Sequence, residues 1–208
     1  MSRILSLLGS PSARSRSGAL LAEMEGRLAA ALDVPQPPRR VVLRELPAAA
    51  LLAGDAAAAP IVEAIAALRE ARLVLVATPI YKAAYSGLLK AFLDVLPQDA
   101  LRGKTIVPLA SGGSLAHLLA LDYALRPVLA ALGAHDIRAA VFATDAQLPL
   151  HADAHRPVHE LGLRLDRAVA DLLEPAEAWA ARVEARPVAV VPRARIPALD
   201  VIEARCSA

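Results

Sequence analysis

A segment near the N-terminus, residues 9–18, carries a dense set of hydrogen-bond donors. It reads Gly-Ser-Pro-Ser-Ala-Arg-Ser-Arg-Ser-Gly, with four hydroxyls, two guanidiniums and two glycines. A helical pattern of apolar residues follows, so free backbone N–H groups at a helix start would accompany these side chains. Phosphate or a similar anion is the ligand that needs such donors. The alternative is a polar loop in which a serine caps the helix.

The same segment lacks two common nucleotide-binding patterns. It is not a Walker A loop, because no Gly-Lys-Ser/Thr follows it, and it lacks the Gly-x-Gly-x-x-Gly fingerprint. Glu45 lies near the end of the second predicted strand, where a dinucleotide site would use an acidic residue for the ribose. Without the glycine fingerprint, this residue does not predict a dinucleotide site.

Two further segments have the composition of ligand-binding loops. Residues 78–87 read Thr-Pro-Ile-Tyr-Lys-Ala-Ala-Tyr-Ser-Gly, and their small side chains would let a flat ligand lie against the main chain. Residues 110–114, Ala-Ser-Gly-Gly-Ser, would bring backbone N–H groups close to ligand oxygens. An ordinary surface loop is the alternative for residues 78–87, and residues 110–114 alone would not identify a site.

The elements that must position these segments alternate along the chain. Apolar runs predict buried strands over residues 4–8, 41–43, 73–77, 105–109 and 137–142. Helical spacing predicts helices from Ser15 to about residue 32 and over residues 60–68, 86–96, 115–132 and 158–185. This alternation is typical of a parallel α/β sheet with right-handed crossovers.

The order of the elements brings the three polar segments to one place. Each follows a predicted strand, and ligands of open α/β sheets bind beyond the carboxyl ends of the strands. One phosphate loop beside two loops suited to a flat ring is the geometry that FMN would need. Hydride transfer to a flavin requires no protein nucleophile, and we find no catalytic triad in the sequence.

Composition limits the other classes of function. Hydrophobic residues make up 56% of the 208 residues, enough for one sizeable core, whereas aromatic residues are only 3%, which argues against an aromatic platform for nucleic acid. No run of about 20 apolar residues is present, so we expect no membrane partner. The single cysteine, Cys206, excludes an internal disulfide and fits a cytoplasmic location.

The polar segments resemble those of one family. Gly-Ser-Pro followed by Ser-Arg-Ser, Thr-Pro-Ile-Tyr-Lys-Ala-Ala-Tyr-Ser-Gly-Leu-Leu-Lys and Ser-Gly-Gly-Ser resemble the NADPH-dependent FMN reductases of the flavodoxin-like superfamily. Residues 115–129 resemble most strongly the FMN reductase component of two-component alkanesulfonate monooxygenases. The resemblance covers residues 3–185, so we expect an FMN reductase domain over 1–185 and a Pro- and Arg-rich extension over 186–208.

The resemblance implies a fold and a set of ligands. The expected fold is a flavodoxin-like, doubly wound sheet of five parallel strands in three layers, with strand order 2-1-3-4-5 and FMN at its carboxyl edge. Many family members have arginine where Ser12 stands, so Arg14 or Arg16 would supply that charge here. The remaining implied FMN ligands are Ser10, Ser15 and Ser17 for the phosphate, Pro79, Ile80, Tyr81 and Lys82 for the ring, and Ser111, Gly112 and Gly113 for its polar edge.

Tyr123 carries the signature of the alkanesulfonate subfamily. In similar reductases an inserted tyrosine forms a π-bulge in this helix, at a tetramer interface near the flavin. The resemblance therefore implies that Tyr123 acts in flavin release or in assembly of a homo-oligomer, a dimer or a tetramer. Pro127 also disturbs the predicted helix. Plain core or interface packing is the alternative role for Tyr123.

The implied activity is transfer of a hydride from NADPH, or NADH, to FMN. Reduced FMN would then leave for a flavin-dependent monooxygenase of sulfonate metabolism. Two alternatives stay open: a quinone or azo reductase that binds FMN tightly, and a non-enzymatic flavodoxin-like electron carrier. The net charge of +2 argues against a carrier, because flavodoxins are typically strongly acidic.

No metal site is expected. His151, His155 and His159 repeat every four residues and would share one face of an unbroken helix, where they could bind a metal. Pro157 interrupts that pattern, so a solvated loop is the predicted structure there.

Overall fold

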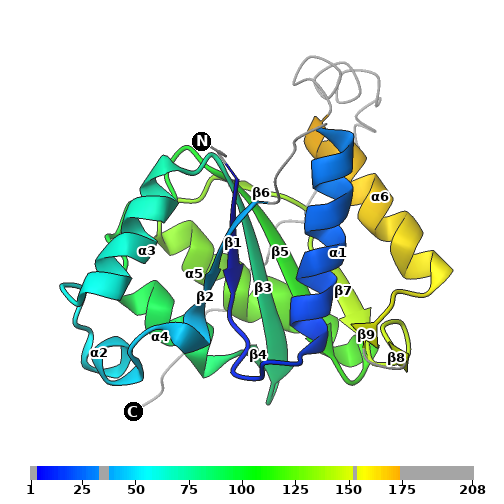
Figure 1. Ribbon diagram of the computed structural model, residues 1–208, viewed down its shortest axis with the longest axis horizontal. Coiled ribbons are helices and arrows are strands. Elements are labelled where there is room, and N and C mark those ends of the chain that lie inside the picture. The colour runs from blue at the N-terminus through cyan, green and yellow to red at the C-terminus, as the bar shows by residue number, and fades with distance from the viewer. Residues whose placement is uncertain (1–3, 33–37, 152–153, 174–208) are drawn as a thin grey trace, which may run out of the picture. The chain divides into compact units, whose positions relative to one another are not determined.

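The computed structural model describes residues 4–32, 38–151 and 154–173, which form a parallel sheet with helices on both faces (Figure 1). The strands run in the order β2-β1-β3-β5-β6, and β7 also pairs with β5. This is the predicted order 2-1-3-4-5, because β5 is the fourth long strand and β6 and β7 share the fifth place. The strands of this path are β1 (Ile4–Leu8), β2 (Arg39–Val42), β3 (Leu73–Tyr81), β5 (Thr105–Gly112), β6 (Asp136–Ile137) and β7 (Val141–Thr144).

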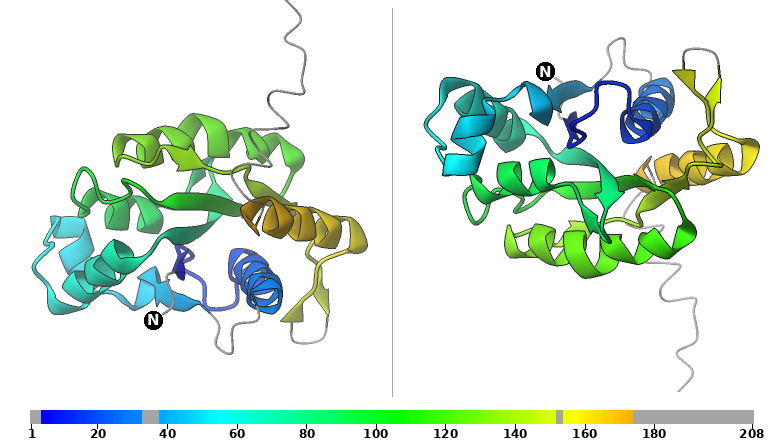
Figure 2. Two further views of the ribbon diagram at one scale, coloured as in Figure 1. Left: turned by 90° about the horizontal axis from the view of Figure 1, so that it is seen from above. Right: turned by 90° about the horizontal axis from the view of Figure 1, so that it is seen from below.

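Alternate side chains of the central strands enter two separate cores, and this alternation creates the three layers. Val74 and Val76 of β3 join the core beneath one group of helices, whereas Leu75 joins the core on the opposite face. All three side chains are fully buried, as a sheet covered on both faces requires. Figure 2 shows the two groups of helices from above and below. The first group is α2 (Ala48–Ala53), α3 (Ala59–Glu70), α4 (Gly87–Asp94) and α5 (Arg126–Ala131), and the second is α1 (Arg16–Ala31) and α6 (His159–Leu173).

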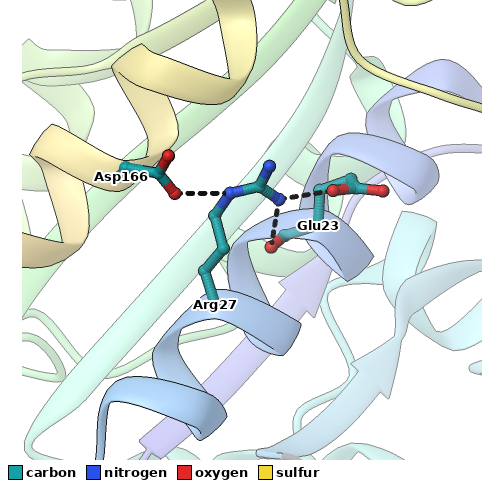
Figure 3. A network of polar contacts seen from close by, with 3 residues as sticks. All are labelled: Glu23, Arg27 and Asp166. Carbon is teal, nitrogen blue, oxygen red and sulfur yellow. Dashed lines mark hydrogen bonds and ion pairs between the residues drawn. The ribbon is translucent and has the colours of Figure 1, made fainter. Parts of the chain in front are cut away.

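The two helices of the second group are joined by a charged network (Figure 3). Arg27 of α1 donates from Nε to Asp166 of α6 over 2.8 Å and pairs with Glu23 one turn earlier on its own helix. Burial lowers the pKa of Arg27, but its hydrogen bonds to Glu23 and Asp166 outweigh that effect and raise it. The network fixes α6 beside α1 on this face of the sheet.

Several predicted boundaries differ from the structure. The strand predicted over 41–43 begins at Arg39 and ends at Val42, and the one predicted over 137–142 is divided into β6 and β7. Both pieces pair with β5. The strands predicted to end at residues 77 and 109 continue to Tyr81 and Gly112. The two strands stay paired beyond the apolar run, where Thr78 lies opposite Ala110 and Pro79 opposite Ser111.

The single helix predicted over residues 115–132 is wrong. This segment instead forms a 3₁₀ turn over Leu115–Leu118, a π-helical turn over Leu121–Leu125 and then α5. Pro127 lies in the first turn of α5, directly after the π-helical turn. The π-helical turn that the resemblance implies around Tyr123 is therefore confirmed.

Short elements were missed, and some predictions fall on residues that the structure does not describe. The missed elements are α2, β4 (Ala84–Tyr85), which pairs with the end of β3, and the hairpin of β8 (Leu150–His151) with β9 (Ala154–His155). Residues 174–185 of the last predicted helix, the boundary at residue 186 and Cys206 lie outside the described residues. Within the described part of the chain, no helix is long and apolar enough to cross a bilayer.

Candidate active site

The loop after β1 is held against the sheet by a close approach at Gly9. Its N–H donates to the Ala77 carbonyl over 2.8 Å, and its carbonyl accepts from the Ser86 hydroxyl. A Cβ atom at Gly9 would lie 2.8 Å from the Cβ of Leu89, so no other residue fits without movement. Ser10 is fully buried, and its hydroxyl accepts from the Ser12 N–H, which folds the loop back on itself.

Helix α1 starts at this loop and points its N-terminus into the site. Ser15 is the N-cap, and its hydroxyl accepts from the Gly18 N–H over 3.1 Å. The Ser17 hydroxyl lies 3.4 Å from that of Ser15. The N–H groups of Arg16 and Ser17 have no partner within the helix, because they belong to its first turn. Two hydroxyls and two N–H groups therefore gather at the positive end of a 16-residue helix.

A cavity of about 300 Å³ opens beside this helix end. It joins residues from the loop after β1, from the ends of β3 and β5, and from the segment after β7. The lining residues are Ser12, Arg14, Ser15, Arg16, Ser17, Pro79, Ile80, Tyr81, Ser111, Gly112, Gly113, Asp145 and His155. Three segments that the sequence analysis selected independently thus line one cavity.

Two residues of the predicted FMN set do not line this cavity. Ser10 lies beneath the loop, where its role is the internal hydrogen bond to Ser12. Lys82 lies at the exposed tip of the turn between β3 and β4, with a φ of 49°. All other members of the predicted set line the cavity.

Three residues that line the cavity, Ser12, Asp145 and His155, were not in the predicted FMN set. Asp145 follows β7 at the carboxyl edge, so the segment after the fifth predicted strand was the signal that could have found it. Nothing in the sequence placed His155, because its position depends on the β8–β9 hairpin. The solvated loop predicted for His151, His155 and His159 is wrong in detail, since the first two lie in this hairpin and His159 begins α6.

Arg16 is the charged residue whose surroundings are best defined. Its Nη1 lies 3.3 Å from a carboxylate oxygen of Asp145, and both side chains are partly exposed. Its Nε is buried and has no hydrogen-bond partner among the described residues. A buried guanidinium N–H without a partner carries a desolvation cost, which an anion in the cavity would offset.

The ring side of the cavity is built from backbone. Thr78 accepts from the Ser86 N–H over 3.0 Å and holds the turn that follows β3. At the end of β5, a Cβ on Gly112 would meet the Phe142 ring at 3.1 Å, whereas a Cβ on Gly113 would meet nothing within 4 Å. The main chain at Gly113 therefore faces open space, as a flat ligand with polar edges requires.

Tyr123 lies apart from the cavity lining. It belongs to the π-helical turn and is 79% exposed, and Leu115 and Leu119 of the segment that precedes this turn are exposed as well.

The cavity residues fit a monophosphate joined to a flat ring. Hydroxyls, helix N–H groups and guanidiniums lie at one end, and an open backbone surface lies at the other. The family model described as NADPH-dependent FMN reductase matches residues 2–148, well over half of the chain. The chain belongs to the NADPH-dependent FMN reductase family.

Individual proteins similar to this chain are consistent with membership of this family. The FMN reductase (NADPH) of Pseudomonas putida is 39% identical over 186 residues, which cover 89% of this chain and 91% of that protein. The FMN reductase (NADPH) of Escherichia coli K12 is 55% identical over 105 residues, 49% of this chain and about half (53%) of that protein. The apo form of an NADH:FMN oxidoreductase is 41% identical with a TM-score of 0.72, covering 81% and 86% of the two chains.

The fold and the enzyme class predicted from the sequence are confirmed. The chain is an oxidoreductase of the flavodoxin-like fold that uses FMN with a reduced nicotinamide. The relatives are named for NADPH in one case and for NADH in another, so both nicotinamides occur among similar proteins.

Proposed function

We propose that this FMN reductase binds FMN in the carboxyl-edge cavity and releases it, once reduced, to a flavin-dependent monooxygenase. The observation that carries the proposal is that one cavity joins the donor-rich start of α1 to the turns after β3 and β5. A monophosphate and a flat ring need these two environments side by side. The cavity volume of about 300 Å³ lies at the lower end of the range for small-molecule sites.

The phosphate end would be held by charge and by directed donors. The hydroxyls of Ser15 and Ser17 and the first N–H groups of α1 converge there. Arg16 adds its Nε, which has no hydrogen-bond partner within the described ranges, and Arg14 adds a guanidinium to the lining. Charge-assisted hydrogen bonds of this kind are about twice as strong as neutral ones, so this end would anchor the phosphate.

The ring end orients the reactants. Bound FMN supplies the group that accepts a hydride from the nicotinamide. Pro79 and Ile80 give the cavity a fixed apolar wall, and the Ser111 to Gly113 segment presents backbone to the polar edge of a ring. Tyr81 is 50% exposed at the mouth, where it can cover a bound ring from water.

Release to a partner enzyme is supported by the openness of the site. Ser12, Arg14 and Tyr81 line the cavity and are themselves exposed, so a flavin can enter and leave without unfolding of the domain. The resemblance of residues 115–129 to reductases of alkanesulfonate monooxygenase systems favours a monooxygenase of sulfonate metabolism. A cytoplasmic location suits a reductase that depends on reduced nicotinamide and whose one cysteine is Cys206.

Tyr123 is proposed to link assembly with flavin release. A tyrosine that is 79% exposed, with exposed leucines in the preceding segment, favours burial in a homo-oligomer, a dimer or a tetramer. Replacing Tyr123 with Ala should slow flavin turnover or cause flavin to stay bound during purification. Unchanged kinetics together with an unchanged mass by light scattering would remove Tyr123 from both roles.

Steady-state nicotinamide oxidation with free FMN, FAD and riboflavin tests the proposal. We expect FMN to be the preferred acceptor and the purified protein to carry little flavin. A yellow protein that reduces free FMN slowly would favour a tightly bound quinone or azo reductase instead. Absence of nicotinamide oxidation with FMN would favour an electron carrier. The partner is tested separately, by product formation when a flavin-dependent alkanesulfonate monooxygenase is added.

A further inference from the structure

We propose that His155 is a further phosphate-binding residue of the cavity, donating from Nε2 to the phosphate monoester of FMN. This inference rests on the proposed function, because it assumes that FMN binds in this cavity. His155 is distant in sequence from the donor-rich loop at residues 9–18, yet it lines the same cavity as Arg14 and Arg16. The resemblance to FMN reductases did not include it among the FMN ligands.

The β8–β9 hairpin brings His155 to the start of α1. Leu150 pairs with His155 in this antiparallel hairpin, and β9 lies beside α1 (Figures 1 and 2). Backbone hydrogen bonds close the base of the hairpin, from the Arg156 N–H to the Pro149 carbonyl over 3.1 Å and from the Val158 N–H to the Gln147 carbonyl over 3.0 Å. The position of His155 is thus fixed by main-chain bonds.

The ring of His155 is oriented by one hydrogen bond. Its Nδ1 lies 3.0 Å from the carbonyl oxygen of Leu148, a residue whose side chain is fully buried. A carbonyl only accepts, so Nδ1 carries a proton and Nε2 is the nitrogen left for a ligand. Among the described residues, Nε2 has no hydrogen-bond partner. A ring held in this way is typical of a histidine oriented to bind.

The charges around the phosphate end are of both signs. Among the described residues, the other charged side chains in the lining are Arg14, Arg16 and Asp145. Asp145 lies 3.3 Å from Arg16 and offsets part of the guanidinium charge that a phosphate would use. A phosphate monoester carries about −1.5 to −2 at neutral pH. An unprotonated phosphate oxygen accepts a hydrogen bond, so a donor at Nε2 would add to the hydroxyls, N–H groups and guanidiniums already at this end of the cavity.

Two substitutions separate phosphate binding from support of the hairpin. His155→Asn keeps an amide N–H close to the position of Nδ1, so it can retain the bond to Leu148, but it has nothing at the position of Nε2. His155→Gln places an amide N–H close to the position of Nε2 and loses the bond to Leu148. His151→Asn is the matched control, because His151 lies exposed on the same hairpin and does not line the cavity.

Equilibrium titration by flavin fluorescence, with FMN and with riboflavin, tests the proposal on the full chain. We expect His155→Asn to raise the Kd for FMN about tenfold or more, as loss of a hydrogen bond to a charged group does. The Kd for riboflavin should stay within about twofold, since riboflavin lacks the phosphate. His155→Gln should recover part of the FMN affinity, and His151→Asn should change neither Kd.

Other results would overturn the proposal in distinguishable ways. Equal weakening of FMN and riboflavin by His155→Asn would mean that His155 only supports the fold of the site. An effect on the KM for NADPH but not for NADH, with FMN binding unchanged, would assign His155 to the 2′-phosphate of NADPH. If the unmodified protein does not distinguish FMN from riboflavin, the proposed function itself fails, whatever the His155 variants do.

Discussion

Two cations at opposite edges of the sheet differ in how their nitrogens are satisfied. At the amino edge, the buried Lys104 donates to the carbonyls of Arg69 and Ala71 over 3.1 and 2.8 Å, so its ammonium is satisfied within the fold. At the carboxyl edge, Arg16 Nε and His117 Nδ1 are buried without a hydrogen-bond partner among the described residues. Lys104 therefore has its partners within the fold, whereas Arg16 and His117 leave nitrogens available beside the cavity.

This difference separates a structural polar group from a ligand-binding one. An unsatisfied buried polar group costs about 1–3 kcal/mol, so a protein can retain such groups where a ligand offsets the cost. Residues at the carboxyl edge should therefore affect FMN binding more than stability, and residues at the amino edge should do the reverse.

The largest effect is expected at Arg16. Replacing Arg16 with Met should raise the Kd for FMN about 10- to 100-fold, equivalent to about 1.5–3 kcal/mol for hydrogen bonds to a charged group. The free energy of unfolding should change by less than about 1 kcal/mol, because the pair with Asp145 is partly exposed. Flavin titration and urea unfolding measure the two quantities. If Arg16→Met lowers the free energy of unfolding by more than it weakens FMN binding, the ligand-binding role of Arg16 is contradicted.

Lys90→Met is the matched control for Arg16. Lys90 forms an exposed pair with Asp94 at 2.7 Å and does not line the cavity. Both its FMN affinity and its unfolding free energy should stay close to those of the unmodified protein.

Two glycines at the carboxyl edge should respond differently. Gly9→Ala should lower the free energy of unfolding by about 1–3 kcal/mol, because its Cβ would overlap Leu89. Gly113→Ala should leave stability within about 0.5 kcal/mol, since its Cβ would enter open space. Urea unfolding of both variants gives the comparison. Equal losses would show that Gly113 faces packed protein rather than a ligand space.

At the amino edge, Lys104→Met should reduce stability while leaving FMN binding unchanged. The loss should be about 1–2 kcal/mol at neutral pH, because the carbonyls of Arg69 and Ala71 lose their donor. Weakened FMN binding at constant stability would contradict the structural role.

The pH dependence of stability in the unmodified protein and in Lys104→Met tests the direction of the Lys104 pKa shift. Burial, and then the charge of Arg72, lower the pKa of Lys104 in the folded state. The unfolded chain therefore binds this proton more tightly, and the contribution of Lys104 to stability rises as pH increases from its folded pKa to about 10.5. The stability gap between the unmodified protein and Lys104→Met should widen over that window in urea unfolding. A stability gap that narrows over that window would mean that the pKa of Lys104 is raised in the folded state, contrary to the structure.

The smallest effect concerns backbone strain in the turn beside the cavity. Lys82 and Ala83 have φ values of 49° and 62°, as a two-residue hairpin turn requires, although neither is glycine. Ala83→Gly should raise the free energy of unfolding by about 0.5–1 kcal/mol, because glycine adopts this conformation without strain. Gly54→Ala, at a φ of 69° far along the chain, should lower it by about 1 kcal/mol. A loss with Ala83→Gly would mean that the turn is not strained.

Much of the fold follows from the sequence because its central strands are continuously apolar. Val74 to Ala77 predict a doubly covered strand, and the structure buries all four residues completely. The continuation of β3 could not be predicted in this way. Thr78 breaks the apolar run and Pro79 is disfavoured in strands, and both stay in the strand because β5 pairs beside them.

The site was predictable where its residues follow strands directly. The loops that contain Ser15, Tyr81 and Gly112 line the cavity, because parallel strands end at one edge. Asp145 and His155 reach the cavity through tertiary arrangement, by the segment after β7 and by a hairpin whose strands have two residues each. The place of Asp145 after the fifth predicted strand was its one sequence signal, whereas His155 carried none.

A crystal structure of the protein with FMN bound tests the central claim most directly. We predict the phosphate within hydrogen-bond distance of Ser15, Arg16 and Ser17, and the flavin ring along the turns after β3 and β5. A flavin bound elsewhere, with no ligand at the N-terminus of α1, would contradict the assignment of this edge as the active site.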